Sequence, residues 1–102
     1  MQCDVYRNAD DRSGEMPFLL DVQADLLSEL HTRVVVPLIR SEAFGRRATR
    51  MHPQFSVDGQ DVVMATHLIA AVRRQVLADA VGSLRDRRDD VIAAIDVLWS
   101  GV

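Results

Sequence analysis

The sequence contains one cysteine and no lysine, and none of its hydrophobic stretches is long. With Cys3 as its single thiol, the chain cannot form an internal disulfide, which suits a reducing compartment. No apolar run approaches the roughly 18 residues that a membrane span requires. Residues 1–14 are polar and lack the apolar core of a signal peptide. We therefore expect a cytoplasmic protein with no membrane association.

Aromatic residues are also scarce, at 5% of the chain, and Trp99 is the only tryptophan. All 12 basic residues are arginine, and 15 acidic residues bring the formal net charge to −3. This balance does not favour a general nucleic-acid-binding protein. Hydrophobic residues make up 48% and charged residues 26% of the 102 residues, which is typical of a soluble globular domain. We expect one domain spanning residues 1–102, with a modest core.

Three stretches in the first half of the chain have the pattern of β-strands. Gln2–Arg7 alternates, with Cys3 and Val5 on one face, as in a half-buried strand. Phe18–Gln23 follows a proline, which fits the first residue of a strand. Thr32–Ile39 contains three consecutive valines and predicts the strongest strand, buried on both faces.

Turn and loop signals separate these strands from a hairpin. Asp25–Leu30 is predicted to be a short link with a helical turn, and Ser41–Met51 a loop or a short irregular helix. Asp58-Gly59 lies between the strand-like stretches Gln54–Val57 and Gln60–Thr66. This dipeptide favours a two-residue type I′ turn, because both of its positions need a positive φ.

The final third of the chain is predicted to be mainly helical by propensity. Leu68–Val81 has apolar residues at helical spacing, and Ser83–Val102 has the pattern of one amphipathic helix. Ser83 and Asp86 have the spacing of a capping box, and Gly101 lies where a helix commonly ends in the left-handed conformation. The apolar stripe of the last helix comprises Leu84, Val91, Ile95, Leu98 and Val102. Strands followed by one long helix indicate an α+β fold, with a curled antiparallel sheet and a helix packed on it.

Trp99 lies on the last turn of this predicted helix, and two interpretations are open. By residue type, a tryptophan is more often packed into the body of a domain. Alternatively, an aromatic side chain on an exposed terminus is an anchor for a binding partner. Exposure of the ring distinguishes the two.

Few residues suggest catalysis or metal binding. His31, His52 and His67 are far apart in sequence, so surface or structural roles are favoured over a zinc or catalytic site. Cys3 lies on the inward face of its strand, which favours a buried, inert thiol. The arginine pair at 73 and 74 and the mixed charges of residues 85–90 favour solvated surfaces. We expect no cofactor, no metal and no enzymatic activity.

Several stretches together carry a family resemblance. The residues are Met1-Gln2 and Val5-Tyr6, then the run Phe18-Leu19-Leu20-Asp21-Val22-Gln23-Ala24-Asp25-Leu26-Leu27, followed by Val36-Pro37-Leu38, His52-Pro53, Asp90-Val91, Ala94-Ile95 and Gly101-Val102. In these residues and in length, the chain resembles the CcdB family of toxins from toxin–antitoxin pairs. The resemblance covers almost the whole chain.

This resemblance implies a homodimer with an SH3-like curled β-sheet and a long C-terminal helix, and a strand within Leu68–Val81, against the propensity. It implies a toxin that binds the DNA gyrase A subunit and traps gyrase on cleaved DNA, without catalytic chemistry of its own. It also implies a CcdA-like antitoxin, whose disordered segment removes the toxin from gyrase. The family's target-contacting surface corresponds here to Gln23, Ala24, Leu26, Leu27, Ala93, Asp96, Trp99, Ser100, Gly101 and Val102.

The C-terminus departs from the family pattern of an aromatic residue followed by Trp, Gly and an aliphatic residue. Here Trp99 occupies the place of the first aromatic residue and Ser100 the place of the tryptophan. One residue along a helix is about 100° of rotation, since there are about 3.6 residues per turn. Ala24 also stands where the family can have a hydroxyl. The alternatives are therefore a CcdB-fold dimer that no longer poisons gyrase, or an endoribonuclease toxin of the related MazF and Kid type.

Overall fold

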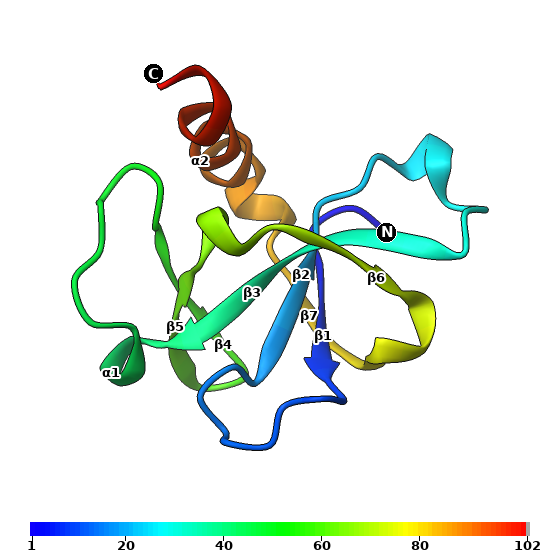
Figure 1. The fold of residues 1–102 in the computed structure, drawn as a ribbon, viewed down its shortest axis with the longest axis horizontal. Helices are drawn as coiled ribbons and strands as arrows, with labels where there is room; N and C mark the ends of the chain where they lie inside the picture. Colours follow the sequence, from blue (N-terminus) through cyan, green and yellow to red (C-terminus); the bar gives the residue numbers. More distant parts are fainter. Residues whose placement is uncertain (102) are drawn as a thin grey trace.

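Seven β-strands form one antiparallel sheet that curls around the core, and a C-terminal helix covers it (Figure 1). The computed structural model describes residues 1–101. The strands pair in the order β4-β5-β3-β2-β1-β7, and β6 also pairs with β3. They are β1 (Asp4–Asn8), β2 (Phe18–Asp21), β3 (Thr32–Arg40), β4 (Gln54–Val57), β5 (Gln60–Met64), β6 (Ala70–Arg73) and β7 (Leu77–Ser83). The helical elements are η1 (Asp25–Leu27), α1 (Ser41–Phe44), η2 (Thr66–Leu68), η3 (Arg74–Val76), η4 (Arg85–Arg87) and α2 (Arg88–Ser100).

The curl of the sheet originates at β3, which has three partners. One edge of β3 pairs with β2, so that Leu20 lies opposite Val36. On the other edge, Thr32–Val35 pairs with β6, whereas Leu38–Arg40 pairs with β5. The two strands on that edge diverge, and the sheet bends between them (Figure 1). The fold is therefore the α+β class predicted from the sequence, with an SH3-like curled sheet and a C-terminal helix.

The hairpin between β4 and β5 is confirmed. Val57 pairs with Gln60, so only Asp58 and Gly59 form the turn. Both have positive φ, at 50° and 76°, as a type I′ turn requires. The helical turn η1 within Asp25–Leu30 is also confirmed, as is the short helix α1 in the segment predicted as a loop or irregular helix.

The propensity-based helix over Leu68–Val81 is wrong, and the strand implied by the family resemblance is present. The segment forms β6 and β7, joined by η3. β6 completes the free edge of β3, and β7 pairs with β1. Backbone pairing with two open strand edges outweighs a helix propensity that no buried face supports, since Leu68 and Ala80 are exposed.

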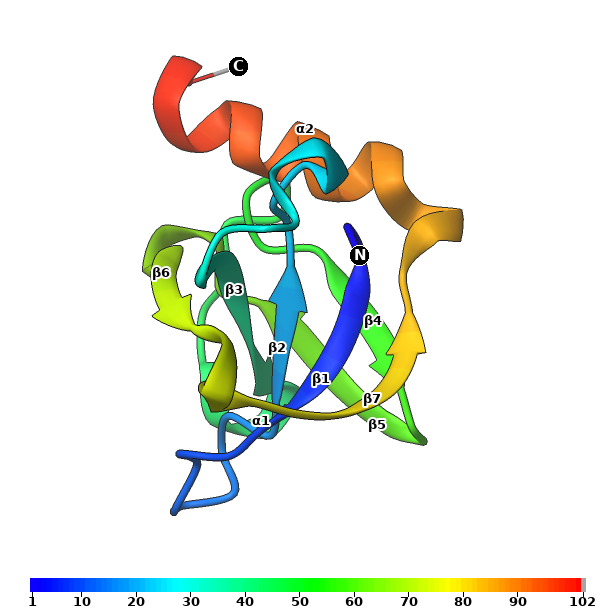
Figure 2. The same cartoon turned by 90° about the vertical axis from the view of Figure 1, so that its right-hand side faces the viewer.

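The C-terminal helix is shorter than predicted at its start. Ser83 is the last residue of β7 and pairs with Asp4, so it cannot begin the helix. Its hydroxyl accepts a hydrogen bond from the Arg85 amide, at 3.2 Å, and makes none with Asp86, so the predicted capping box is absent. The helical part then runs through η4 into α2, which lies across the top of the sheet (Figure 2).

The core lies between the concave side of the sheet and α2. Leu84, Val91, Ala94 and Ile95 are the buried residues of the C-terminal segment. They pack on a cluster from the sheet that comprises Val5, Phe18, Leu20, Val36, Leu38, Phe55, Val57, Val62 and Met64. Burying a side chain such as Ile95 contributes roughly 1.5–3 kcal/mol. No helix within residues 1–101 is both long and apolar enough to cross a membrane.

Candidate target-binding surface

The outer face of α2 carries four of the residues that the family resemblance assigns to target binding. Ala93, Asp96, Trp99 and Ser100 are all exposed, whereas Val91, Ala94 and Ile95 on the inner face are buried. Trp99 is 69% exposed and is not part of the core. The interpretation of Trp99 as a core residue is therefore wrong, because the ring lies on the face of α2 that points away from the sheet.

The end of α2 has a defined shape. Gly101 adopts the left-handed conformation, with φ 77° and ψ 11°, and its amide donates to the Val97 carbonyl at 3.0 Å. Glycine reaches this conformation without steric cost. The Ser100 hydroxyl turns back to donate to the Asp96 carbonyl at 2.5 Å. The Ser100 side chain is therefore turned back onto its own helix, while Trp99 is exposed; Val102 lies outside the described residues.

The second part of the predicted surface is the segment Gln23–Leu27. Ala24, Leu26 and Leu27 are exposed, and Leu26 reaches 86%. Leu30, which the sequence did not single out, is exposed as well and extends this apolar patch. Exposed leucines this close together are typical of an interaction surface.

Gln23 differs from its neighbours because it is buried. Its side-chain amide donates to the Leu27 carbonyl at 2.9 Å, and its side-chain oxygen accepts from the Val34 amide at 2.9 Å. The two bonds tie η1 to β3. Gln23 therefore positions the exposed residues of the segment, and its own polar atoms are already used inside the chain.

A buried ion pair supports the same segment. The Asp21 carboxylate accepts from the Arg33 side chain at 2.5 Å and 3.2 Å, and both residues are almost fully buried. The other oxygen of Asp21 accepts from the Gln23 amide at 3.0 Å. Sequence reasoning identified Asp21 only as a family signature residue and assigned Gln23 to the target-contacting surface. In the structure both side chains are buried and hold η1 in place.

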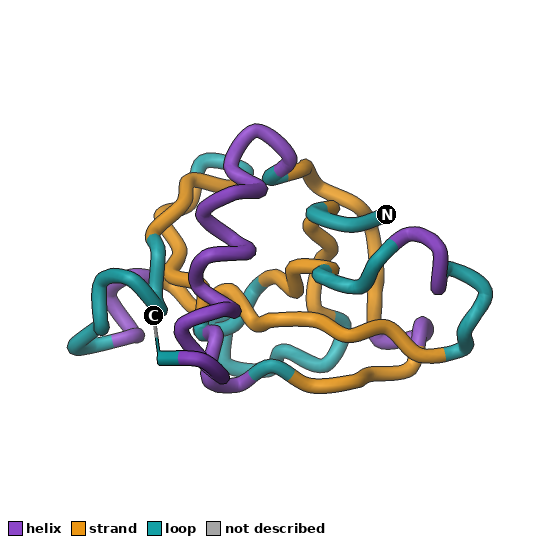
Figure 3. The backbone as a smooth tube through the Cα atoms, turned by 90° about the horizontal axis from the view of Figure 1, so that it is seen from above, coloured by secondary structure: helices purple, strands orange, loops and turns teal. Residues whose placement is uncertain are grey.

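The two parts of the surface do not meet within one chain. In Figures 1 and 3 the η1 segment and the C-terminal end of α2 lie well apart along the horizontal direction, although Figure 1 places both at the top of the molecule. Tyr6 of β1, the Asp21–Arg33 pair and Arg74 of η3 line a cavity of about 320 Å³, to which Ser28, next to η1, also contributes. A single target surface would have to bridge the two parts or combine them across a second copy.

Two of the three histidines, which are far apart in sequence, lie side by side in the structure. His52 Nε2 lies 3.0 Å from His67 Nδ1, and both rings contact Phe44 edge-on. These residues line a cavity of about 480 Å³, together with Ile39, Ala43, Arg46 and Met51. Burial lowers the pKa of His52 below its usual value. No group of three or more metal-ligating side chains occurs among residues 1–101, and no carboxylate lines this cavity.

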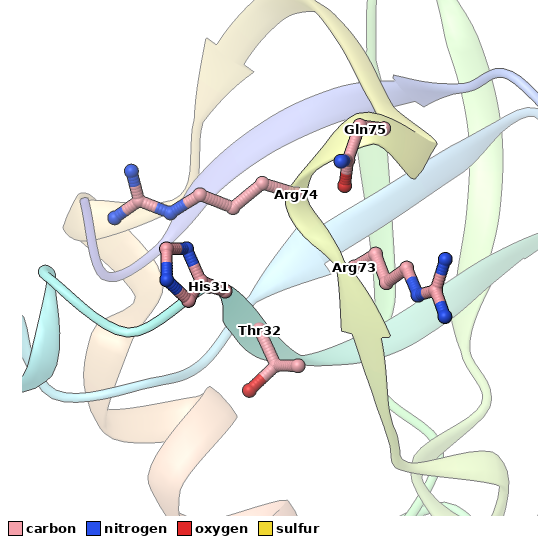
Figure 4. A pocket seen from close by; sticks show the side chains of 5 residues that line it. All are labelled: His31, Thr32, Arg73, Arg74 and Gln75. Atoms are coloured by element: carbon pink, nitrogen blue, oxygen red, sulfur yellow. The ribbon is translucent and has the colours of Figure 1, made fainter.

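The remaining candidates have the surroundings expected of inactive groups. Cys3 is buried as predicted, and burial raises the pKa of its thiol, which disfavours the reactive thiolate. Arg73 and Arg74 line a cavity of about 360 Å³ with His31, Thr32 and Gln75. Figure 4 shows the Arg74 guanidinium beside His31 and that of Arg73 on the far side of the strand. The two guanidinium groups diverge and do not converge on one anion.

Comparison with known proteins agrees with this architecture. Two solved structures share the fold. One is an endoribonuclease in complex with its cognate antitoxin from Mycobacterial species, with 15% identity, 98% of this chain and 94% of that chain covered, and a TM-score of 0.75. The other is an endoribonuclease from Mycobacterial species, with 16% identity, coverage of 98% and 90%, and a TM-score of 0.73. At this identity the likeness concerns the fold alone.

The comparison with protein families covers nearly the entire chain. The family described as CcdB protein matches residues 2–101, which includes both parts of the candidate surface as far as Gly101. The signature residues Asp21 and Gln23 and the exposed end of α2 all lie within the match. The chain therefore belongs to the CcdB family, a family of toxins of toxin–antitoxin systems.

Proposed function

We propose that this protein is a toxin that binds the A subunit of DNA gyrase through the end of α2 and the η1 segment and traps gyrase on cleaved DNA. The observation that carries the proposal is the exposed Trp99 ring at the end of a capped helix, in a chain of the CcdB family. An exposed aromatic ring of this kind is typical of an anchor residue, whose removal costs about 2 kcal/mol or more of binding free energy.

The proposal includes a homodimer and an antitoxin, both in the cytoplasm. The exposed apolar side chains Leu26, Leu27, Leu30 and Trp99 are typical of an interaction surface. A twofold dimer would supply two copies of each part of the surface and so could combine η1 of one protomer with α2 of the other. A disordered CcdA-like segment is the expected antitoxin, since one of the proteins with this fold is in complex with its cognate antitoxin.

The test compares the wild-type chain with Trp99→Ala and with a chain that ends at Leu98. All buried residues of α2 precede Trp99, so both variants should unfold thermally like the wild type. Binding to purified gyrase A subunit should weaken by about 30-fold or more in both, because about 2 kcal/mol corresponds to that factor. Gln75→Ala, an exposed change on η3, is the matched control and should bind as the wild type does. Folded variants that bind gyrase normally would refute the proposed site.

A family-like variant separates an active toxin from a fold that no longer poisons gyrase. Trp99→Phe combined with Ser100→Trp moves the tryptophan one position along the helix, by about 100°. If this variant stabilises cleaved gyrase complexes and the wild type does not, the shifted tryptophan has cost the wild-type chain its poisoning activity. Equal activity of both chains shows that the shift is tolerated.

The ribonuclease alternative is favoured by one observation, the fold shared with two endoribonucleases. Purified protein is therefore incubated with a defined single-stranded RNA alongside the gyrase assay. We expect no cleavage, because general acid–base chemistry needs two groups that reach the substrate, and both ring nitrogens of His52 are already hydrogen-bonded to the Ala48 amide and to His67. Cleavage that a single substitution in the chain abolishes would replace the gyrase proposal.

A further inference from the structure

The segment between α1 and β4, residues 45–53, is held by contacts of His52 and, at its end, by the Pro53 carbonyl, which accepts a hydrogen bond from the Met64 amide at 2.9 Å. The ring Nδ1 accepts a hydrogen bond from the Ala48 amide at 2.9 Å, and the His52 carbonyl accepts one from the Arg47 side chain at 2.9 Å. The ring Nε2 reaches His67 Nδ1 on η2, at 3.0 Å. The Thr66 hydroxyl donates to the Met51 carbonyl and adds one further tie from η2. His52 thus makes hydrogen bonds both within the segment and to η2.

These contacts determine where the protons lie on both rings. A backbone amide only donates, so His52 Nδ1 must present a lone pair to Ala48. The proton of neutral His52 is then on Nε2, and that group donates to His67 Nδ1. His67 Nδ1 must in turn be unprotonated, which leaves the proton of His67 on its own Nε2. Both imidazoles are therefore neutral in this arrangement.

A further proton on either ring breaks a hydrogen bond. On His52 it would sit on Nδ1 and face the Ala48 amide; on His67 it would sit on Nδ1 and face the His52 N–H. The nearby charges add to this effect: Arg46 and Arg47 come from the segment itself, and no acidic side chain lines the cavity. Glu42 of α1 is 3.7 Å from Arg40 and does not line the cavity. An imidazolium here has cations around it and no counter-charge.

We propose that the His52–His67 hydrogen bond is an acid-sensitive latch that holds residues 45–53 against η2 at neutral pH and releases them on acidification. Opening removes the His52 contact with η2 and frees a segment that contains Arg46, Arg47 and Arg50. The latch thereby couples the mobility of this basic segment, whose arginines are already exposed, to pH, at a place distinct from the end of α2.

The pH direction follows from proton linkage. Burial lowers the pKa of His52, and His67 and Arg47 lower it further. A histidine with a lowered pKa contributes its stabilisation fully above the ordinary value of about 6.5, and this contribution is lost as pH falls through that value toward the lowered one. If only the open form binds the proton, and one histidine is responsible, the fraction of molecules with the segment released grows about 30-fold as the pH falls from 7.5 to 5.0.

Amide hydrogen exchange of the full-length chain tests the latch. Protection factors, which correct for the intrinsic pH dependence of exchange, should fall by about 30-fold for the hydrogen-bonded amides of Ala48, Met51 and His52 between pH 7.5 and pH 5.0. Amides of β2 and of the β3 centre provide the reference and should change far less. His52→Gln should show low protection of the segment at both pH values. His31→Asn, which changes an exposed histidine elsewhere, should respond as the wild type does.

Ring-nitrogen NMR of the wild-type protein provides a second measurement that does not depend on any variant folding. At pH 7.5 the ¹⁵N shifts should show a proton on Nε2 and none on Nδ1 for both His52 and His67. A proton on Nδ1 of His52, or segment protection that is independent of pH in the wild type, would overturn the latch.

Discussion

The two parts of the candidate surface are held in opposite ways. The segment Gln23–Leu27 is braced from inside, through the Asp21–Arg33 ion pair and the two side-chain hydrogen bonds of Gln23. The end of α2 extends beyond Ile95, its last buried residue, and within residues 1–101 no side chain from another element hydrogen-bonds to it there. The η1 patch therefore has a preset shape, whereas the tip of α2 depends only on the helix itself.

Because of this difference, we expect mutations near η1 and mutations at the end of α2 to affect different properties, stability and binding respectively. Changes beneath the η1 patch should act mainly through folding, because the residues that shape the patch are buried. Changes at the tip of α2 should act mainly through binding, because the exposed residues there contribute little to the core. Three substitutions test this separation, from the largest expected effect to the smallest.

Asp21→Asn should have the largest effect. The amide retains an acceptor for the Gln23 N–H but leaves the buried Arg33 guanidinium without its counter-charge, which costs about 3–5 kcal/mol of unfolding free energy. Chemical denaturation measures this loss. The double variant Asp21→Asn with Arg33→Met removes the unpaired charge and should recover part of the stability. If the double variant is as unstable as the single one, the ion pair is not the cause.

The contacts that hold η1 in place could not be predicted from the sequence. The strands β1 to β5, the Asp58-Gly59 turn and the buried positions Val91 and Ile95 of α2 follow from local patterns, and the structure has them. The Asp21–Arg33 pair joins neighbouring strands and the His52–His67 pair joins two loops. No spacing rule links such residues along the chain, so only the folded structure shows that they are in contact.

The error over Leu68–Val81 has the same origin. Local propensity favours a helix there, but the open edges of β1 and β3 lack backbone partners until this segment supplies them. Unpaired backbone groups are costly when buried, so the sheet determines the conformation. For Trp99, residue type alone favoured a core position, and only the rotation of α2 on the sheet shows that the ring is exposed.

Ile95→Ala should have the next largest effect. Ile95 packs against the sheet on the inner face of α2, so truncation should cost about 2–5 kcal/mol through lost burial and a cavity. Ile92→Ala is the matched control, since Ile92 is only half-buried and should cost about 1 kcal/mol. Thermal unfolding of both variants gives the comparison. Gyrase affinity, measured where both are folded, should change little; a large loss of affinity in folded Ile95→Ala would mean that the inner face also shapes the tip.

Gly101→Ala should have the smallest effect, confined to the last turn of α2. A side chain at Gly101 meets no atom within 4 Å, so the only cost is the left-handed backbone, about 1 kcal/mol for alanine. Global unfolding should be unchanged, because Gly101 lies beyond the last buried residue. The amide of residue 101, bonded to the Val97 carbonyl, should exchange about five times faster, as 1 kcal/mol implies. Gly101→Asn, which tolerates this conformation better, should lie between the two. Equal exchange in all three chains would show that the left-handed conformation of residue 101 does not hold the last turn of α2.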